Sequence, residues 1–301
     1  MNKEIVVVEA PSNLGLREPS PGNEPGVRFL SKSLINAGLL EKLNVKSSTF
    51  VMPPAYSAKI DEDSGVLNGV KIKEYSLELS KALDLQISSD NFCVVLGGDC
   101  SVLIGIALSL RKKGTYGLMF IDGHTDFVWP EYSSSKAAAA MELAIVTGNG
   151  NEKLSNIELL SPYVRENDVF CVGNREDDPI VVQLINESEI HYEDLNSIRI
   201  KGIENIVNDF FTHIQKRKLD GFWIHLDVDV LNDQIMPCVD HRQKGGLTYD
   251  ELHAILYPLL NSDLVYGIDI TIFDPELDSS GEVARELTSY TVKWFSPLIS
   301  K

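Results

Sequence analysis

Short runs of apolar, often β-branched residues alternate along the chain with stretches that have the periodicity of amphipathic helices. In residues 203–216 apolar side chains recur every three or four positions, and residues 248–260 carry a second such pattern that begins with a Thr248–Glu251 capping-box motif. Strands and helices that alternate in this way predict a parallel sheet with helices on both faces. The predicted strands cover residues 5–8, 92–96, 116–121, 168–172, 222–228 and 264–270.

The segments between these elements do not resemble interdomain linkers. Stretches rich in Pro and Gly at 11–26 and 53–69 predict long loops, and the sequence has no internal repeat. A chain of 301 residues with 44% hydrophobic and 24% charged residues is long enough for one large hydrophobic core. We therefore expect a single domain over residues 1–301.

The composition argues against several classes of partner. The 27 Lys and Arg residues against 44 Asp and Glu give a net charge of −17, which disfavours binding to nucleic acid or to an anionic membrane. The longest apolar stretch, 102–108, is far shorter than the roughly 20 residues of a membrane-spanning helix. The N-terminus fits a strand better than a signal peptide. A cytoplasmic location is therefore expected, with the four cysteines present as thiols.

Polar clusters occur at the carboxyl ends of three predicted strands, where ligands bind in open parallel sheets. Residues 97–101 read Gly-Gly-Asp-Cys-Ser, and residues 122–126 read Asp-Gly-His-Thr-Asp. Alternate residues of an extended chain point to the same side, so we expect Asp122, His124 and Asp126 to share a face.

The third cluster lies within the predicted strand 222–228 and just after it. His225, Asp227 and Asp229 alternate with apolar residues, and a period of two places the three polar side chains on one face. A buried ionised carboxylate costs several kcal/mol unless it is paired with a cation or bound to metal. Because no basic residue lies near these clusters in the sequence, we expect divalent metal ions between the carboxylates.

The motifs Gly-Gly-Asp-Cys-Ser, Asp-Gly-His-Thr-Asp and Asp-Val-Asp-Val, in this order, resemble the three metal signatures of the ureohydrolase family, which includes arginase, agmatinase and formiminoglutamase. Similar segments at 173–179, 245–249 and 267–270 extend the resemblance over most of the chain. The resemblance implies a three-layer α/β fold around a parallel sheet of eight strands. It also implies two Mn²⁺ ions and a homo-oligomer, either a trimer or a hexamer.

The same resemblance implies a mechanism and a set of ligands. A hydroxide shared by the two ions would attack the sp² carbon of a guanidinium or amidine, and urea and an amine would result. Asp126 would hold this hydroxide and then pass a proton to the leaving nitrogen. His225 is expected to orient a ligand rather than to bind metal. The first ion would be held by Cys100, Asp122, Asp126 and Asp227, and the second by His124, Asp122, Asp227 and Asp229.

Position 100 departs from the family, because its better-known members have histidine there. A Cys100 thiolate adds one negative charge and favours softer ions such as Zn²⁺ or Fe²⁺ over Mn²⁺. Alternatively, Cys100 remains a thiol, and a single ion binds to His124 and the aspartates.

Substrate recognition departs from the family as well. Ile272 stands where arginase and agmatinase have the glutamate that binds guanidinium, and the histidine-glycine signature expected after the second cluster is absent. His241 is either a replacement for that missing proton shuttle or a surface histidine. Asp178 matches an aspartate that contacts the α-amino end of the substrate in arginase, or else belongs to a solvated acidic turn. Glu131 and Glu142 are further candidates for binding a cationic substrate.

Two functions fit these observations. The first is a metallohydrolase that cleaves a linear C–N bond in a small cationic guanidino or amidino compound. The second is a non-catalytic metal-binding or ligand-sensing protein, which the missing glutamate and histidine favour. The four aspartates support the hydrolase, because buried carboxylates that cost stability have no reason to remain together in a scaffold without metal chemistry.

Overall fold

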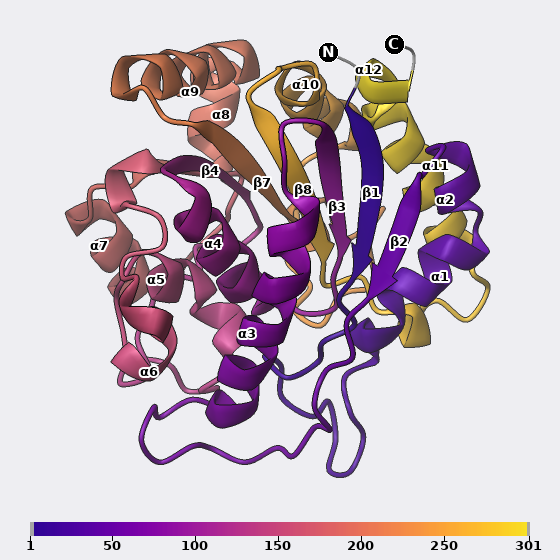
Figure 1. Cartoon of the computed structure of the whole chain (residues 1–301). Coiled ribbons are helices and arrows are strands. Elements are labelled where there is room, and N and C mark those ends of the chain that lie inside the picture. Colours follow the sequence, from indigo (N-terminus) through magenta and orange to yellow (C-terminus); the bar gives the residue numbers. More distant parts are fainter. Residues whose placement is uncertain (1–2, 300–301) are drawn as a thin grey trace.

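The computed structural model describes residues 3–299, and this part of the chain forms one sheet of eight parallel strands (Figure 1). Their order across the sheet is β2-β1-β3-β8-β7-β4-β5-β6. The predicted three-layer α/β fold is therefore confirmed. The strands are β1 (Glu4–Glu9), β2 (Ser47–Phe50), β3 (Asn91–Leu96), β4 (Tyr116–Ile121), β5 (Val169–Val172), β6 (His191–Glu193), β7 (Gly221–Asp227) and β8 (Val265–Thr271).

The six strands expected from apolar runs are present within one or two residues of their predicted ends. The two that the pattern did not reveal, β2 and β6, are the outermost strands of the sheet. Their sequences, Ser-Ser-Thr-Phe and His-Tyr-Glu, are short and largely polar, since an edge strand is only partly buried. A search for buried runs therefore finds the six inner strands and misses both edges.

Helices cover both faces of the sheet (Figure 1). One face packs against α1, α2 and α8–α12, and the other against α3–α7. The helices are α1 (Leu30–Asn36), α2 (Leu39–Lys42), α3 (Gly69–Gln86), α4 (Val102–Lys113), α5 (Glu142–Val146), α6 (Glu152–Ser155), α7 (Pro179–Glu187), α8 (Leu195–Lys201), α9 (Ile203–Arg217), α10 (Tyr249–Leu260), α11 (Glu282–Trp294) and α12 (Ser296–Ile299). Short 3-10 segments lie at Gly26–Phe29, Ala138–Ala140, Ile157–Leu159, Glu166–Asp168, Val228–Val230 and Pro275–Leu277.

The strands supply both cores by alternation. In β1, Ile5 and Val7 belong to one hydrophobic core, whereas Val6 and Val8 belong to the other. Strands buried on both faces are continuous apolar runs, which is the pattern that identified them in the sequence. The predicted capping box at the start of α10 is also present, with Thr248 and Glu251 exchanging hydrogen bonds.

The carboxyl ends of the four central strands bring the three polar clusters together. Strands β3, β8, β7 and β4 are neighbours in this order, and the clusters follow β3, β4 and β7. Gly98 is required here, because a Cβ atom at this position would lie 1.8 Å from the carbonyl oxygen of Ser12. The carbonyl oxygen of Gly98 in turn accepts a hydrogen bond from the Ile272 amide at 2.7 Å, which ties the β3 turn to the residue that follows β8.

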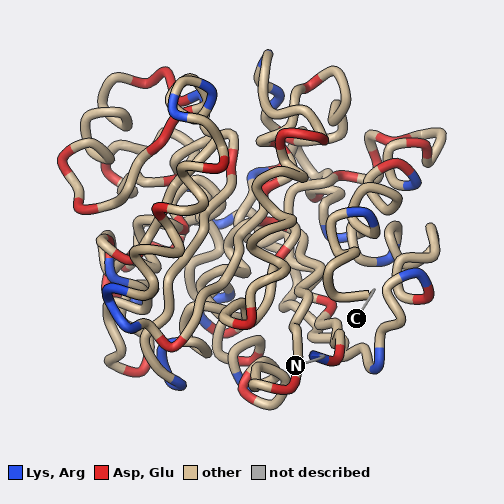
Figure 2. The backbone as a smooth tube through the Cα atoms, turned by 90° about the horizontal axis from the view of Figure 1, so that it is seen from above, with Lys and Arg blue, Asp and Glu red and all other residues tan. Residues whose placement is uncertain are grey.

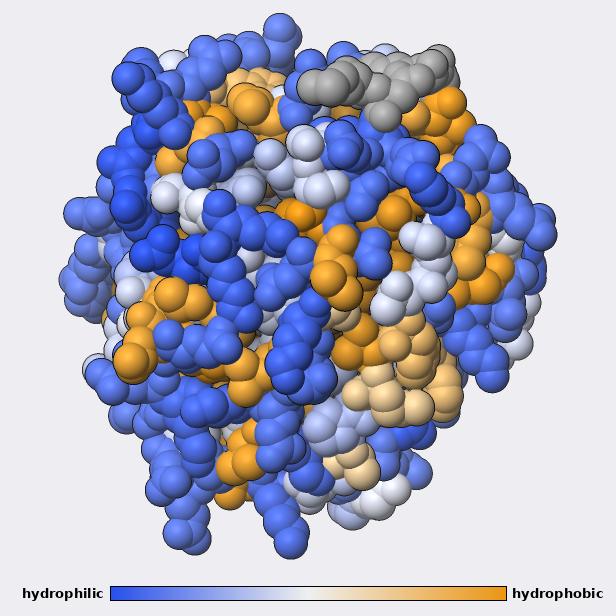
Figure 3. Space-filling model, in the orientation of Figure 1, coloured by the Kyte–Doolittle hydropathy of each residue, from blue (hydrophilic) through white to orange (hydrophobic). Residues whose placement is uncertain are grey.

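The surface carries the charge that the composition indicates. Asp and Glu are spread around the whole molecule, with Lys and Arg between them (Figure 2). The face seen in Figure 3 is mainly hydrophilic, with scattered hydrophobic patches. Within residues 3–299, none of the helices has both the length and the apolar character needed to cross a membrane.

Candidate metal centre

Two groups of potential metal ligands meet at the ends of the central strands, and they share one residue. Asp122, His124 and Asp229 form the smaller group, in which the ligand atoms lie within 4.8 Å of one another. The larger group obeys the same limit and consists of four buried residues, which are Cys100, Asp122, Glu142 and His225. Asp122 follows β4 directly and belongs to both groups.

The second cluster forms a tight turn and not the extended segment that we expected. The Asp122 carboxylate accepts a hydrogen bond from the His124 amide at 2.6 Å, which folds the chain back after β4. Asp126 then adopts a left-handed backbone with φ of 44°. The simple alternation of side chains is therefore wrong, although the turn still brings Asp122 and His124 into one group.

The third cluster departs from the prediction in a similar way. Strand β7 ends at Asp227, and Val228–Val230 form a 3-10 turn, so Asp229 is not part of the strand. The Asp227 carboxylate accepts a hydrogen bond from the Asp229 amide at 2.7 Å. Asp229 reaches the site from this turn, where its Oδ2 lies 2.9 Å from His124 Nδ1 and its Oδ1 accepts the Gly123 amide at 2.9 Å.

Cys100 lies in the turn between β3 and α4 and is completely buried. Its Sγ donates a hydrogen bond to Asp227 Oδ2 at 3.0 Å and lies 3.1 Å from the hydroxyl of Thr271, the last residue of β8. The first and third clusters therefore meet through this sulfur atom. Burial and the negative charges of Asp227 and Glu142 raise the pKa of the Cys100 thiol well above its ordinary value.

His225 is held by an aspartate that no motif singled out as a site residue. Its Nδ1 lies 2.5 Å from Oδ2 of Asp269, in the middle of β8, and its ring stacks on Phe120 at 4.6 Å between centroids. Asp269 also accepts a hydrogen bond from the Trp223 indole at 2.7 Å. A lone aspartate inside the apolar run of residues 264–270 is the signal that could have identified it.

A basic residue does approach the carboxylates, contrary to the expectation from sequence. Arg175 follows β5, and its guanidinium donates to the carbonyl oxygens of Asp229 at 2.8 Å and Val230 at 2.9 Å. Proximity in space could not be inferred from positions far apart in the chain. Because these bonds go to backbone oxygens, Arg175 lowers the local negative potential without pairing with a carboxylate side chain.

Burial, together with the negative charge of the clustered carboxylates, raises the pKa of most carboxyl groups in the site. Burial raises the pKa of Asp122, Asp126, Asp227 and Glu142, and their mutual repulsion adds to the effect. Asp229 differs, because His124, the Gly123 amide and Arg175 together outweigh its burial and lower its pKa.

The pKa values of His124 and His225 are raised, although burial by itself would lower them. Although burial lowers the pKa of a histidine, Asp229 raises the pKa of His124 to about 10, and Asp269 does the same for His225. Cations are therefore strongly favoured in the centre, and a metal ion would compete with protons for the same ligand atoms.

The donor atoms fit a divalent metal. Within residues 3–299, no hydrogen-bond partner is found for Asp122 Oδ2, His124 Nε2, His225 Nε2 or either carboxylate oxygen of Glu142, although all are buried. Buried polar atoms are normally paired, and those left over from internal bonding are free to bind metal. Carboxylate, imidazole and thiol groups together suit first-row divalent ions.

Two further predicted residues flank these groups. Asp126 is 8% exposed, and its charge interacts with Glu142, Asp122 and Asp227. The ring of His241 packs edge-on against His124, with 5.0 Å between ring centroids. His241 is exposed and lies beside the smaller ligand group, so both interpretations of this histidine stay open.

Two predicted substrate residues lie at the surface. Asp178 is exposed, and its carboxylate caps α7 by accepting the Ile180 amide at 2.8 Å. Glu131 is exposed in the loop between β4 and α5. Ile272 is 3% exposed and has a φ of 73°, a left-handed conformation that β-branched residues rarely adopt.

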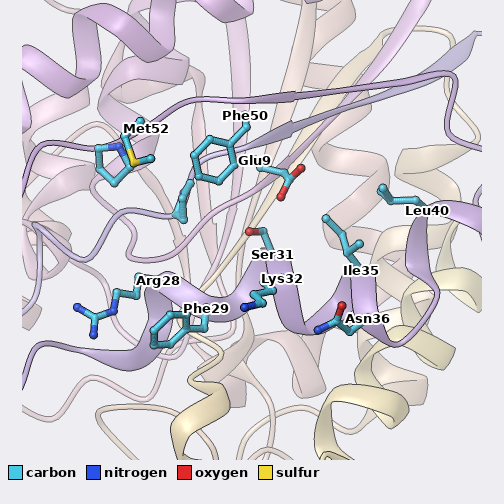
Figure 4. A pocket seen from close by; sticks show the side chains of 12 residues that line it. Glu9, Arg28, Phe29, Ser31, Lys32, Ile35, Asn36, Leu40, Phe50 and Met52 are labelled. Atoms are coloured by element: carbon cyan, nitrogen blue, oxygen red, sulfur yellow. The ribbon is translucent and has the colours of Figure 1, made fainter.

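A surface groove of about 540 Å³ lies elsewhere, between α1 and the edge formed by β1 and β2. Phe29, Ile35, Phe50 and Met52 line it together with Arg28 and Lys32 (Figure 4). None of the predicted metal ligands is among its lining residues. The groove is therefore separate from the metal centre.

The protein is thus an α/β protein with an all-parallel sheet and a candidate metal centre of carboxylate, imidazole and thiol side chains at its central strand ends. The sequence also matches the model of the Arginase family over residues 3–293. The chain therefore belongs to the arginase family, as its motifs predicted.

Individual relatives agree with this assignment. Arginase of Staphylococcus aureus (strain COL) is 29% identical in an alignment 301 positions long, and the alignment covers 97% of each of the two chains. Among solved structures, arginase from Bacillus caldovelox has a TM-score of 0.86 at 24% identity and covers 97% of this chain and 98% of its own. Formimidoylglutamase from Bacillus subtilis has a TM-score of 0.72 at 18% identity, with coverage of 98% and 87%.

Proposed function

We propose that the protein is a metal-dependent hydrolase that cleaves a linear C–N bond in a small cationic guanidino or amidino compound. The observation that carries this proposal is the pair of ligand groups that share Asp122, buried at the carboxyl ends of the central strands. The family membership supports the reaction class. The relatives named arginase favour a catalytic role over a non-catalytic one.

The metal ligands proposed from the family comparison are Cys100, Asp122, His124, Asp126, Asp227 and Asp229. Two divalent ions bound there would lower the pKa of a shared water and supply hydroxide near neutral pH. Mn²⁺ is the expected metal of the family, and Zn²⁺ or Fe²⁺ are the alternatives that Cys100 introduces.

Asp126 is the proposed acid-base residue. Burial and the charges of Glu142 and Asp122 raise its pKa well above that of an ordinary aspartate, which favours proton uptake by this carboxyl. It would receive a proton from the nucleophilic water and deliver it to the departing nitrogen. His241 is the proposed second proton carrier, since it lies against His124 and reaches the site from a different loop.

The substrate cannot be recognised through a glutamate at position 272, because Ile272 provides no charge there. Glu131 and Asp178 are exposed and can contact the cationic parts of a substrate that extend away from the metal centre. We therefore propose a substrate of the guanidino or amidino class without specifying arginine. A homo-oligomer and a cytoplasmic location remain part of this proposal.

A substrate screen tests the function. The protein loaded with Mn²⁺, Zn²⁺ or Fe²⁺ is incubated with arginine, hydroxyarginine, agmatine, guanidinobutyrate and formiminoglutamate, and the release of urea, formamide and amine is measured. We expect metal-dependent release from at least one compound, and its loss in Asp126→Asn. The absence of product from every compound with every metal would refute the proposal.

A further inference from the structure

We propose that Glu142 and His225 are metal ligands that complete, with Cys100 and Asp122, a site for a borderline-soft divalent ion such as Zn²⁺ or Fe²⁺. The inference rests on the proposed function, because it concerns the same centre, and it changes the identity of two ligands. It replaces the expectations that Glu142 binds substrate and that His225 only orients another ligand.

The four side chains come from different parts of the fold and converge on one point. Cys100 precedes α4, Asp122 follows β4, Glu142 begins α5, and His225 lies in β7. Their ligand atoms all lie within 4.8 Å of one another. Ligands held at about 2.0 to 2.3 Å from one ion lie within roughly 4.6 Å of each other, so binding needs little rearrangement.

Glu142 lies against the Asp126 carboxyl, so two acidic groups meet here. It is completely buried, and no donor outside this acidic cluster is found for either of its carboxylate oxygens within the described chain. A protein carboxylate that binds substrate must be reachable from solvent. Glu142 is 0% exposed and lies at the start of a helix packed into the core. A cation bound directly to its oxygens satisfies it better than a ligand that must enter from outside.

His225 has the arrangement that metal-bound histidines commonly show. One ring nitrogen, Nδ1, contacts the carboxylate of Asp269 at 2.5 Å, which leaves Nε2 to face Asp122 Oδ2 at a distance of 3.8 Å. Metal-binding histidines usually give their second nitrogen to a carboxylate in this way, which fixes the ring and makes it a stronger ligand. Across residues 3–299, both Nε2 and the facing Asp122 Oδ2 lack a hydrogen-bond partner.

The ligand chemistry indicates which ion the site prefers. One thiol, one imidazole and two carboxylates are a softer set than carboxylates and water alone, which suit Mn²⁺. The group around His124 has one imidazole and two carboxylates and no sulfur. The two sites sharing Asp122 therefore differ in softness, and Zn²⁺ should distinguish them more strongly than Mn²⁺.

The experiment compares matched variants of the full chain. Bound zinc is measured by elemental analysis during titration of wild type, Glu142→Gln and His225→Gln. Glu152→Gln is the first control, because Glu152 also begins a short helix but is exposed. His213→Gln is the second, because His213 also contacts an aspartate, at 3.0 Å from Asp168, away from the centre. Melting temperatures with and without zinc report folding.

We expect wild type and both controls to bind two zinc ions, and each site variant to lose roughly 10-fold or more in affinity for one of them. Metal-free Glu142→Gln should melt no lower than wild type, because the amide removes a negative charge from a cluster of carboxylates. Two ions bound with wild-type affinity in both site variants would overturn the inference. Unchanged zinc binding with a raised KM in Glu142→Gln would also overturn it and make Glu142 a substrate contact.

A measurement on the wild-type protein tests the same ligands without any variant, so it still decides the question if a variant does not fold. X-ray absorption at the zinc edge should show sulfur from Cys100 and imidazole from two histidines, and a spectrum without sulfur or with a single imidazole would overturn the inference. The proposed function fails separately: wild type would then bind two zinc ions with these ligands and release no product. Conversely, normal hydrolysis with unchanged zinc affinity in both site variants would refute only the ligand assignment.

Discussion

Asp269 fixes the imidazole of His225 through a contact of 2.5 Å between Oδ2 and Nδ1, and both side chains are completely buried. The pair joins two neighbouring central strands, since His225 and Asp269 face each other in the register of β7 and β8. Asp269 can be buried in an apolar strand because its carboxylate orients His225 and accepts a hydrogen bond from the Trp223 indole.

Asp269→Asn should weaken metal binding without removing a ligand. An amide still accepts the Trp223 indole but holds no negative charge against the His225 ring, so the imidazole becomes a weaker and less well oriented ligand. Loss of such a partner typically costs about 10- to 100-fold in metal affinity. Competition with a coloured chelator measures the change. Asp168→Asn, which alters the His213 contact outside the centre, should leave the affinity as it is.

Asp126→Asn should abolish turnover while the fold persists. Asparagine tolerates the left-handed backbone at this position, where φ is 44°, so the substitution adds little strain. An amide cannot accept the proton of the nucleophilic water, and we expect kcat to fall by about 10²- to 10⁴-fold. Product release and a thermal melt are measured on the same sample. Near-normal rates would show that Asp126 is not the acid-base residue.

Cys100→His should shift metal preference towards Mn²⁺. If Cys100 binds metal as a thiolate, the substitution replaces a soft, negatively charged ligand by a neutral imidazole, which also makes metal-bound water more acidic and moves the acid limb of the pH–rate profile to lower pH. Competition between Mn²⁺ and Zn²⁺ reads out the preference.

Two features of position 100 shape that experiment. The larger ring must fit beside Thr271, whose hydroxyl is 3.1 Å from the sulfur, and overpacking of this kind costs about 1 to 3 kcal/mol. Cys100→Ser is therefore the matched control, since it removes the sulfur at similar size and should weaken Zn²⁺ without gaining Mn²⁺. An unchanged preference and profile in Cys100→His would place Cys100 outside the metal shell.

Asp122→Ala should lose most of the bound metal, because Asp122 belongs to both ligand groups. Metal that binds only the folded state stabilises it by mass action, by about 2.7 kcal/mol when free metal is 100 times its dissociation constant. We expect added metal to raise the melting temperature of wild type far more than that of the variant. Asp227→Ala should behave similarly if Asp227 bridges the ions. Full metal content in both variants would mean that the site lies elsewhere.

The metal-free protein should lose stability as the pH rises. The pKa of folded His124 is about 10 against an ordinary value of 6.5, so its protonated form contributes stability that is complete below about pH 6.5 and is lost as the pH rises through about 10. Thermal melts with a chelator between pH 6 and 10 should show this decline, and His124→Asn should reduce it. His253→Asn, on α10, serves as the control. If the loss of stability with rising pH is the same in His124→Asn as in wild type, other groups cause it.

The inner part of the fold could be predicted because buried parallel strands are continuous apolar runs, and six of them were found in this way. The edge strand Ser47–Phe50 could not, since its residues are mostly polar and its pairing with β1 depends on the finished sheet. The position of the site followed from the same logic, because polar clusters at the ends of parallel strands meet at one edge.

The roles of individual site residues were harder to infer. Asp122, His124 and Asp229 are brought together as expected, but by turns in which a carboxylate accepts a backbone amide, whereas we expected extended segments. The approach of Arg175 to Asp229 joins residues 54 positions apart, and the contact between Asp269 and His225 joins residues 44 positions apart. Such contacts depend on strand order, which a single sequence does not contain.

Asp122 stands in both ligand groups, and this sharing would make the two proposed metal sites thermodynamically dependent on each other. An ion in one site would neutralise and orient a carboxylate that the other site also uses, while its positive charge would repel the second ion. The two affinities are consequently linked by one coupling free energy, which acts equally in both directions. The order in which the sites fill, and whether the second ion binds more or less tightly than the first, is then a property of the pair and cannot be assigned to either site alone.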